Sequence, residues 1–222
     1  MERRPSTAWP TCFTTTPDGL PMAVWLETDR VVRSTVWDPA YGTERTTSFL
    51  LSPGISSPLS LTPVPAAHGA TATIAVVGRR GITLVDLASE RIVTTMRSHG
   101  RTGVFYLRPC VLPSHGRILL AAATSGDIHL WDTADGSPVA RWNAPDTLAL
   151  AAIPLADGRT LLASGAPSGV RIWDPLTGEL RHTLLTGAPV HALAVGAGPA
   201  GPVLHIHGPA GLATLTLDER LL

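Results

Sequence analysis

An aspartate recurs at a nearly constant interval along this chain of 222 residues, each time at the end of a short apolar run. The intervals between successive aspartates are 48, 46, 42 and 44 residues. In three of the five cases a tryptophan directly precedes the aspartate. An interval of this length, held five times, indicates tandem structural repeats. The aspartates are Asp38, Asp86, Asp132, Asp174 and Asp218, and the tryptophans are Trp37, Trp131 and Trp173.

A turn glycine precedes each aspartate at a second regular distance, 16 to 19 residues upstream. Glycine suits tight hairpin turns because it adopts positive φ without strain. Between these markers lie short runs of alternating apolar residues, such as Val170–Trp173, bounded by further turn signals. Each repeat is therefore predicted to contain four antiparallel strands, and the chain to be an all-β β-propeller of about five blades in a single domain, residues 1–222. The predicted units span residues 10–51, 58–97, 103–142, 147–185 and 189–222.

The residues around the aspartates resemble the repeat of the WD40 family over residues 10–222. Val170–Asp174 with Leu176-Thr177-Gly178 carries the resemblance most fully, followed by Ile128–Asp132 and Thr35–Asp38. Leu84–Asp86 and Leu215–Asp218 are diverged copies. The resemblance implies that the repeated tryptophans and aspartates have structural roles.

The WD40 resemblance also implies a hydrogen-bonded set of Asp, His, Ser or Thr, and Trp in each blade. Ser164 is the candidate for the Ser position of the fourth unit, and His99 for the His position that precedes the third. The third unit has Ala122 where a Ser would lie, and no unit has the complete set. We therefore expect the blades to depend mainly on apolar burial between neighbours.

Five repeats are fewer than the seven usual in the WD40 family, and the fifth unit stops where its outermost strand should begin. Pro5–Trp9 has the same spacing as Pro138–Trp142, an outer strand. We hypothesise that residues 4–9 complete the last blade and close the ring. The alternative is an open arc belonging to a larger propeller.

Charge and composition limit the kinds of partner. Seventeen basic and seventeen acidic residues cancel, which argues against nucleic acid or an anionic membrane as the ligand. All the basic residues are arginine, which excludes lysine chemistry and is typical of the GC-rich genomes of actinobacteria. The N-terminus lacks the apolar segment of a signal peptide, and no apolar run approaches the roughly 20 residues of a membrane span. These features predict a cytoplasmic protein.

Catalytic and metal-binding motifs are not apparent. The predicted innermost strands, Ser60–Pro63, Gly103–Leu107, Leu148–Ile153 and Val190–Val195, contain no acidic residue, so we expect no enzyme and no cofactor. His205 and His207 point the same way on a strand, and we interpret them as core or interface residues. Cys12 and Cys110 are interpreted as unpaired buried residues. A propeller hydrolase and a sugar-binding propeller are the alternative functions.

The densest positive charge in the sequence provides the candidate contact surface. The predicted residues are Arg79, Arg80, Arg97, His99, Arg101 and Arg108. In WD40 propellers the corresponding connections share one face, so these residues could together bind an acidic peptide; solvated loops are the alternative. The sequence therefore favours a non-catalytic scaffold for an unidentified protein or peptide partner. Resemblance to bacterial members suggests a regulatory propeller related to those fused to kinases or ATPases.

Overall fold

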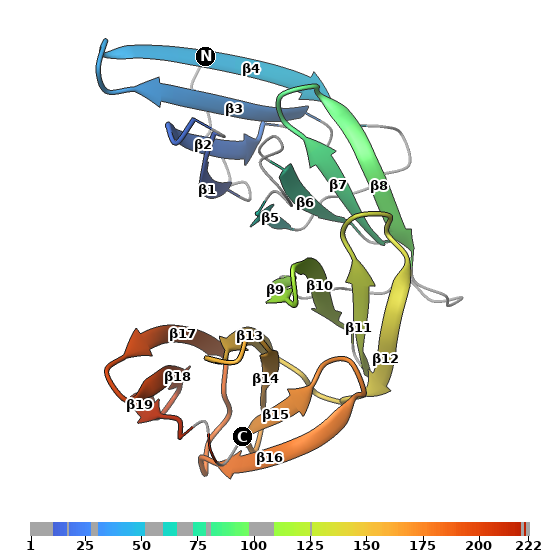
Figure 1. The fold of residues 1–222 in the computed structure, drawn as a ribbon, viewed down its shortest axis with the longest axis vertical. Helices are drawn as coiled ribbons and strands as arrows, with labels where there is room; N and C mark the ends of the chain where they lie inside the picture. The colour runs from blue at the N-terminus through green and yellow to red at the C-terminus, as the bar shows by residue number, and fades with distance from the viewer. Residues whose placement is uncertain are drawn as a thin grey trace, which may run out of the picture. The chain divides into compact units, whose positions relative to one another are not determined.

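The structure of the chain is a computed structural model that describes residues 11–16, 18–27, 31–51, 60–65, 73–78, 81–97, 109–124, 126–218 and 220. These residues form nineteen β-strands arranged in five antiparallel sheets (Figure 1). In every sheet, each strand pairs with the strand that follows it in the sequence. None of the helical structure among the described residues is long and apolar enough to cross a membrane.

The chain divides into two compact units, residues 1–103 and 104–222. The first unit contains two four-stranded sheets. The first sheet consists of β1 (Thr11–Thr15), β2 (Pro21–Leu26), β3 (Val31–Asp38) and β4 (Thr43–Leu50). The second sheet consists of β5 (Ser60–Val64), β6 (Thr73–Gly78), β7 (Gly81–Asp86) and β8 (Arg91–Arg97).

The second unit contains the other three sheets. The third sheet consists of β9 (Cys110–Ser114), β10 (Arg117–Ala123), β11 (Asp127–Asp132) and β12 (Pro138–Asn143). The fourth consists of β13 (Ala149–Pro154), β14 (Thr160–Ala166), β15 (Gly169–Asp174) and β16 (Glu179–Leu185). The fifth consists, within the described residues, of three strands: β17 (Ala192–Gly198), β18 (Gly201–Gly208) and β19 (Gly211–Thr216).

Burial along the strands shows how the sheets pack within each unit. In β2 and β3 every second residue is buried, so one face of the first sheet packs against the second sheet. In β14 every residue is buried, because the fourth sheet is covered on both faces. Leu162 packs toward the third sheet, whereas Leu161 and Ala163 pack toward the fifth. Apolar burial between successive sheets is thus the main source of stability within each unit.

The contact between the third and fourth sheets is the most detailed of these interfaces. The rings of Trp142 on β12 and Trp173 on β15 lie 6.2 Å apart between centroids. Gly178, in the turn after β15, lies against Trp142, and a Cβ atom there would come within 2.9 Å of the Trp142 side chain. The Thr160 hydroxyl on β14 also donates a hydrogen bond to the Pro113 carbonyl on β9.

The sheets confirm the five predicted repeats but correct one strand. The predicted first strand of the third unit was Gly103–Leu107, whose residues lie outside the described part of the chain, and the first strand of that sheet is Cys110–Ser114 instead. The reason is the tight β9–β10 hairpin, whose turn residues His115 and Gly116 both have positive φ. In such a hairpin the paired strand ends directly before the turn, so the first strand lies closer to the turn than we predicted. Residues 4–9, which under one of the two hypotheses complete the last blade, also lie outside the described residues, so the choice between a closed ring and an open arc stays untested.

Candidate functional site

All five repeated aspartates cap turns. In each, the Oδ1 atom accepts a hydrogen bond from the backbone N–H two residues further along, the geometry of an Asx turn. The five donors are Ala40 at 2.9 Å, Ala88 at 2.8 Å, Ala134 at 2.9 Å, Leu176 at 3.1 Å and Arg220 at 3.0 Å. These carboxylates are therefore used locally, as predicted. Within the described residues, no three His, Cys, Asp or Glu side chains form a group that could hold a metal ion.

Two of these aspartates also form ion pairs through their second oxygen. Asp132 Oδ2 accepts hydrogen bonds from Arg117 Nη2 at 2.5 Å and Nε at 2.9 Å. Asp174 Oδ2 accepts one from Arg181 Nη2 at 3.2 Å. Partial burial by itself would raise the pKa of Asp174, but hydrogen bonds from Arg181 and from the turn backbone outweigh it and hold this pKa below its ordinary value.

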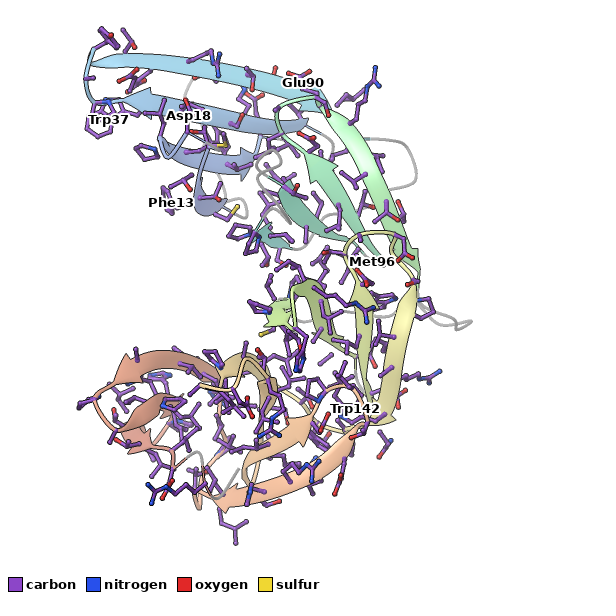
Figure 2. The ribbon with its side chains drawn as sticks, in the orientation of Figure 1. Phe13, Asp18, Trp37, Glu90, Met96 and Trp142 are labelled. Atoms are coloured by element: carbon purple, nitrogen blue, oxygen red, sulfur yellow. The ribbon has the colours of Figure 1, made fainter. Side chains whose placement is uncertain are left out.

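The three tryptophans that precede these aspartates have different environments. Trp173 is buried, and its Nε1–H donates a 2.8 Å hydrogen bond to the Ser164 hydroxyl, so Ser164 occupies the position predicted from the WD40 resemblance. Trp131 is also buried and stacks on His129 with 5.4 Å between ring centroids. Trp37 differs, because it is 49% exposed on the face of the first sheet opposite its core (Figure 2).

The predicted basic contact surface falls almost entirely outside the described residues. Arg97 is the last residue of β8, and its backbone pairs with that of Gly81 on β7. The other five predicted contact residues, Arg79, Arg80, His99, Arg101 and Arg108, lie in connections that the structure does not describe. This surface therefore stays a prediction.

The remaining histidine and cysteine candidates are accounted for by packing and exposure. His205 is half-buried and bonded to the Thr214 hydroxyl at 3.2 Å, and His207 is exposed, so the core part of the core-or-interface interpretation is wrong and the interface part stays a prediction. The alternation of β18 explains this correction, since Leu204 and Ile206 occupy the buried face. Cys12 and Cys110 are both free thiols. Burial raises the pKa of Cys12 to about 11 and that of Cys110 to about 12.

Comparison with known proteins identifies the fold. No protein-family model matches the chain, and no curated protein matches it. Among solved structures, two crystal structures of BBS1N in complex with ARL6DN, soaked with lead or with mercury, are similar, with TM-scores of 0.69 and 0.67 and 16% sequence identity in each case. The matches cover 94% of this chain but only 61% and 65% of the BBS1N chains. Together with the five antiparallel sheets, they establish an all-β propeller fold whose described blades have four strands, or three in the fifth.

Proposed function

We propose that this chain is a WD40-type propeller that acts as a non-catalytic scaffold for binding another protein. The main support for the proposal is that the repeated residues maintain the fold, whereas the connections between the sheets vary. The five aspartates are all used to cap turns, so the elements that repeat serve the fold. The connections, such as residues 52–59 and 98–108, differ in length and sequence from one repeat to the next. Rigid sheets that display variable connections are a common arrangement for recognition.

Two further observations support this proposal. The hydrogen bond between Trp173 and Ser164 reproduces part of the polar set of the WD40 family. The similar BBS1N structures are complexes with a protein, ARL6DN. The first strands of the five sheets, β1, β5, β9, β13 and β17, contain no acidic residue, so a hydrolase built on carboxylates at these positions is not favoured.

The more specific proposal concerns the partner and the biological role. Arg97 and Arg101, with the neighbouring arginines, supply a local excess of positive charge in a chain whose total charge is zero. We expect this surface to attract an acidic segment of a partner, because opposite charges steer association. The role would be that of a cytoplasmic regulatory propeller in a bacterium.

An affinity capture experiment tests this proposal. The full chain and its Arg97→Glu/Arg101→Glu variant are immobilised, and the bound proteins are identified by mass spectrometry. An Arg33→Glu/Arg171→Glu variant is the matched control, because it reverses two charges elsewhere. We expect a partner that the wild type and the control retain and the Arg97/Arg101 variant loses. Equal retention by all three proteins would contradict the basic contact surface, and the absence of any specific partner would contradict the scaffold role.

A further inference from the structure

A cavity of about 280 Å³ lies between the first and second sheets, entirely within the first unit. Part of its lining is apolar and comes from Met22, Val36 and Leu87, which are buried members of the core shared by the two sheets. The rest of the lining is polar and comes from the β1–β2 turn, from β3 and β4, and from the turn between β7 and β8. The polar and charged residues are Thr16, Asp18, Ser34, Arg45, Thr47 and Glu90.

The hydroxyl groups in this lining already have partners. Ser34 Oγ and Thr47 Oγ1 lie 2.8 Å apart and share a hydrogen bond. The Thr16 hydroxyl is bonded to the backbone of Leu20. Each hydroxyl oxygen retains the capacity to accept a further hydrogen bond from a ligand, because a hydroxyl has two lone pairs.

The charged groups leave one negative charge uncompensated. A hydrogen bond from Thr16 and the nearby positive charge of Arg45 hold the pKa of Asp18 below its ordinary value. Glu90 forms no ion pair with any other residue that the structure describes. Two carboxylates against one guanidinium give the lining a net charge of about −1 at neutral pH.

Glu90 also has an unusual backbone conformation. It is the fourth residue after its aspartate, and the same position in the first, third and fourth sheets is Gly42, Gly136 and Gly178, with φ of 61°, 74° and 72°. Glu90 adopts the same left-handed conformation, with φ of 56°. A side chain in this region is strained, and such outliers concentrate at functional sites. The turn alone does not require a glutamate here, because three other sheets form it with glycine.

We propose that this cavity binds an arginine side chain of a protein partner, with the guanidinium group on the Glu90 carboxylate. The apolar lining suits the aliphatic part of an arginine, which packs on apolar surface while its charged end stays polar. The several oxygen acceptors suit a guanidinium, which carries five N–H donors, better than an ammonium. Figure 2 labels Asp18 and Glu90, the two carboxylates of the lining. This site differs from the arginine-rich surface proposed above, and it takes a basic group where that surface takes an acidic one.

A titration with two small probes tests the site without knowledge of the partner. N-acetyl-arginine amide and N-acetyl-citrulline amide have nearly the same shape, but only the first carries a positive charge. Each is added to the ¹⁵N-labelled full chain, and amide chemical shifts around residues 16–20 and 87–90 are followed. We expect saturable shifts with the arginine probe and at least about tenfold weaker binding of the citrulline probe, since loss of a charge-assisted hydrogen bond costs at least about this much.

Three variants define the role of Glu90. Glu90→Gln removes the charge but keeps the size, and should reduce binding of the arginine probe to the level of the citrulline probe. Glu90→Gly should do the same while raising the midpoint of thermal unfolding, so a loss of binding cannot be attributed to unfolding. Glu44→Gln removes a charge from β4 outside the cavity and should bind like the wild type. Equal binding of the two probes, unchanged binding by Glu90→Gln, or no saturable shift in the wild type would each overturn the proposal. This test is independent of the affinity capture. A negative result here would overturn the arginine-binding cavity and leave the proposed scaffold role untouched, and the reverse also holds.

Discussion

Exchanging the residues at the last position of two equivalent turns measures the backbone strain at Glu90. Glu90 and Gly42 both follow their aspartate by four residues and have φ of 56° and 61°. The left-handed conformation costs a residue with a side chain about 1–2 kcal/mol. Glycine also makes the unfolded chain more flexible, which lowers the stability of the folded state by about 0.4–1 kcal/mol and so offsets part of the relieved strain. We therefore expect Glu90→Gly to raise the free energy of unfolding by about 0.5–1 kcal/mol.

The reverse substitution provides the matched control. A Cβ atom at Gly42 would meet no other atom within 4 Å, so Gly42→Glu adds strain without a steric clash. We expect it to destabilise the protein by a similar amount, about 0.5–1 kcal/mol. For a chain of this size, each change corresponds to a shift of about 1–4 °C in Tm, upward for Glu90→Gly and downward for Gly42→Glu. Scanning calorimetry measures both shifts.

The result that would refute this reasoning is a fall in Tm for Glu90→Gly. The Glu90 side chain would then stabilise the free protein by more than its backbone conformation costs, and the argument for a ligand would lose its main support. A Gly178→Ala variant calibrates the scale. It has the same backbone strain, and its Cβ atom would also come within 2.9 Å of the Trp142 side chain. It should therefore lower Tm more than Gly42→Glu does.

Three further outcomes are expected. Ser164→Ala leaves the buried Trp173 Nε1–H without its acceptor, so the free energy of unfolding in urea should fall by about 1–3 kcal/mol; no change would contradict the role of this hydrogen bond. Asp174 has a lowered pKa when folded, so the stability that it contributes is complete above the ordinary value of about 3.9 and is lost as the pH falls through the folded pKa. Asp174→Asn should accordingly be less stable than the wild type at pH 7, and acid denaturation should show the difference closing at low pH. Cys12, with a pKa of about 11, should have roughly a hundredfold less reactive thiolate at pH 8 in the folded chain than in urea, and Cys110, with a pKa of about 12, roughly a thousandfold less. Reaction of the folded protein with a disulfide reagent as fast as in urea would contradict these raised pKa values.

The sequence was sufficient to predict the repeats because their markers have local physical causes. An aspartate that caps a turn and a glycine with positive φ act within a few residues, so their spacing survives even where the tryptophan is lost, as at Asp86. The exposure of Trp37 could not be predicted in this way. The motif before Asp38 matches that before Asp174, but burial depends on what covers that face of the sheet, and Trp173 is covered by Trp142.

The cavity could not be predicted from the sequence, for a different reason. Its lining comes from two sheets and is far apart in sequence, from residue 16 to residue 90. One signal was nevertheless present. Comparing the fourth residue after each aspartate would have shown glutamate at position 90 where the first, third and fourth repeats have glycine. The alternation of β18 likewise places His205 and His207 away from the core, which the apolar neighbours alone did not reveal.

The order of strands in the sheets also has a consequence for how the chain folds. Within the residues that the structure describes, every sheet pairs only strands that follow one another in the sequence, and the longest step within a sheet is a short turn or connection. Folding is fast when the residues that must meet are close along the chain. Each sheet can thus begin to form hairpin by hairpin while the ribosome is still synthesising the next one. The apolar faces that stabilise the sheets are buried only when one sheet docks against the next, a step that must follow the formation of the hairpins.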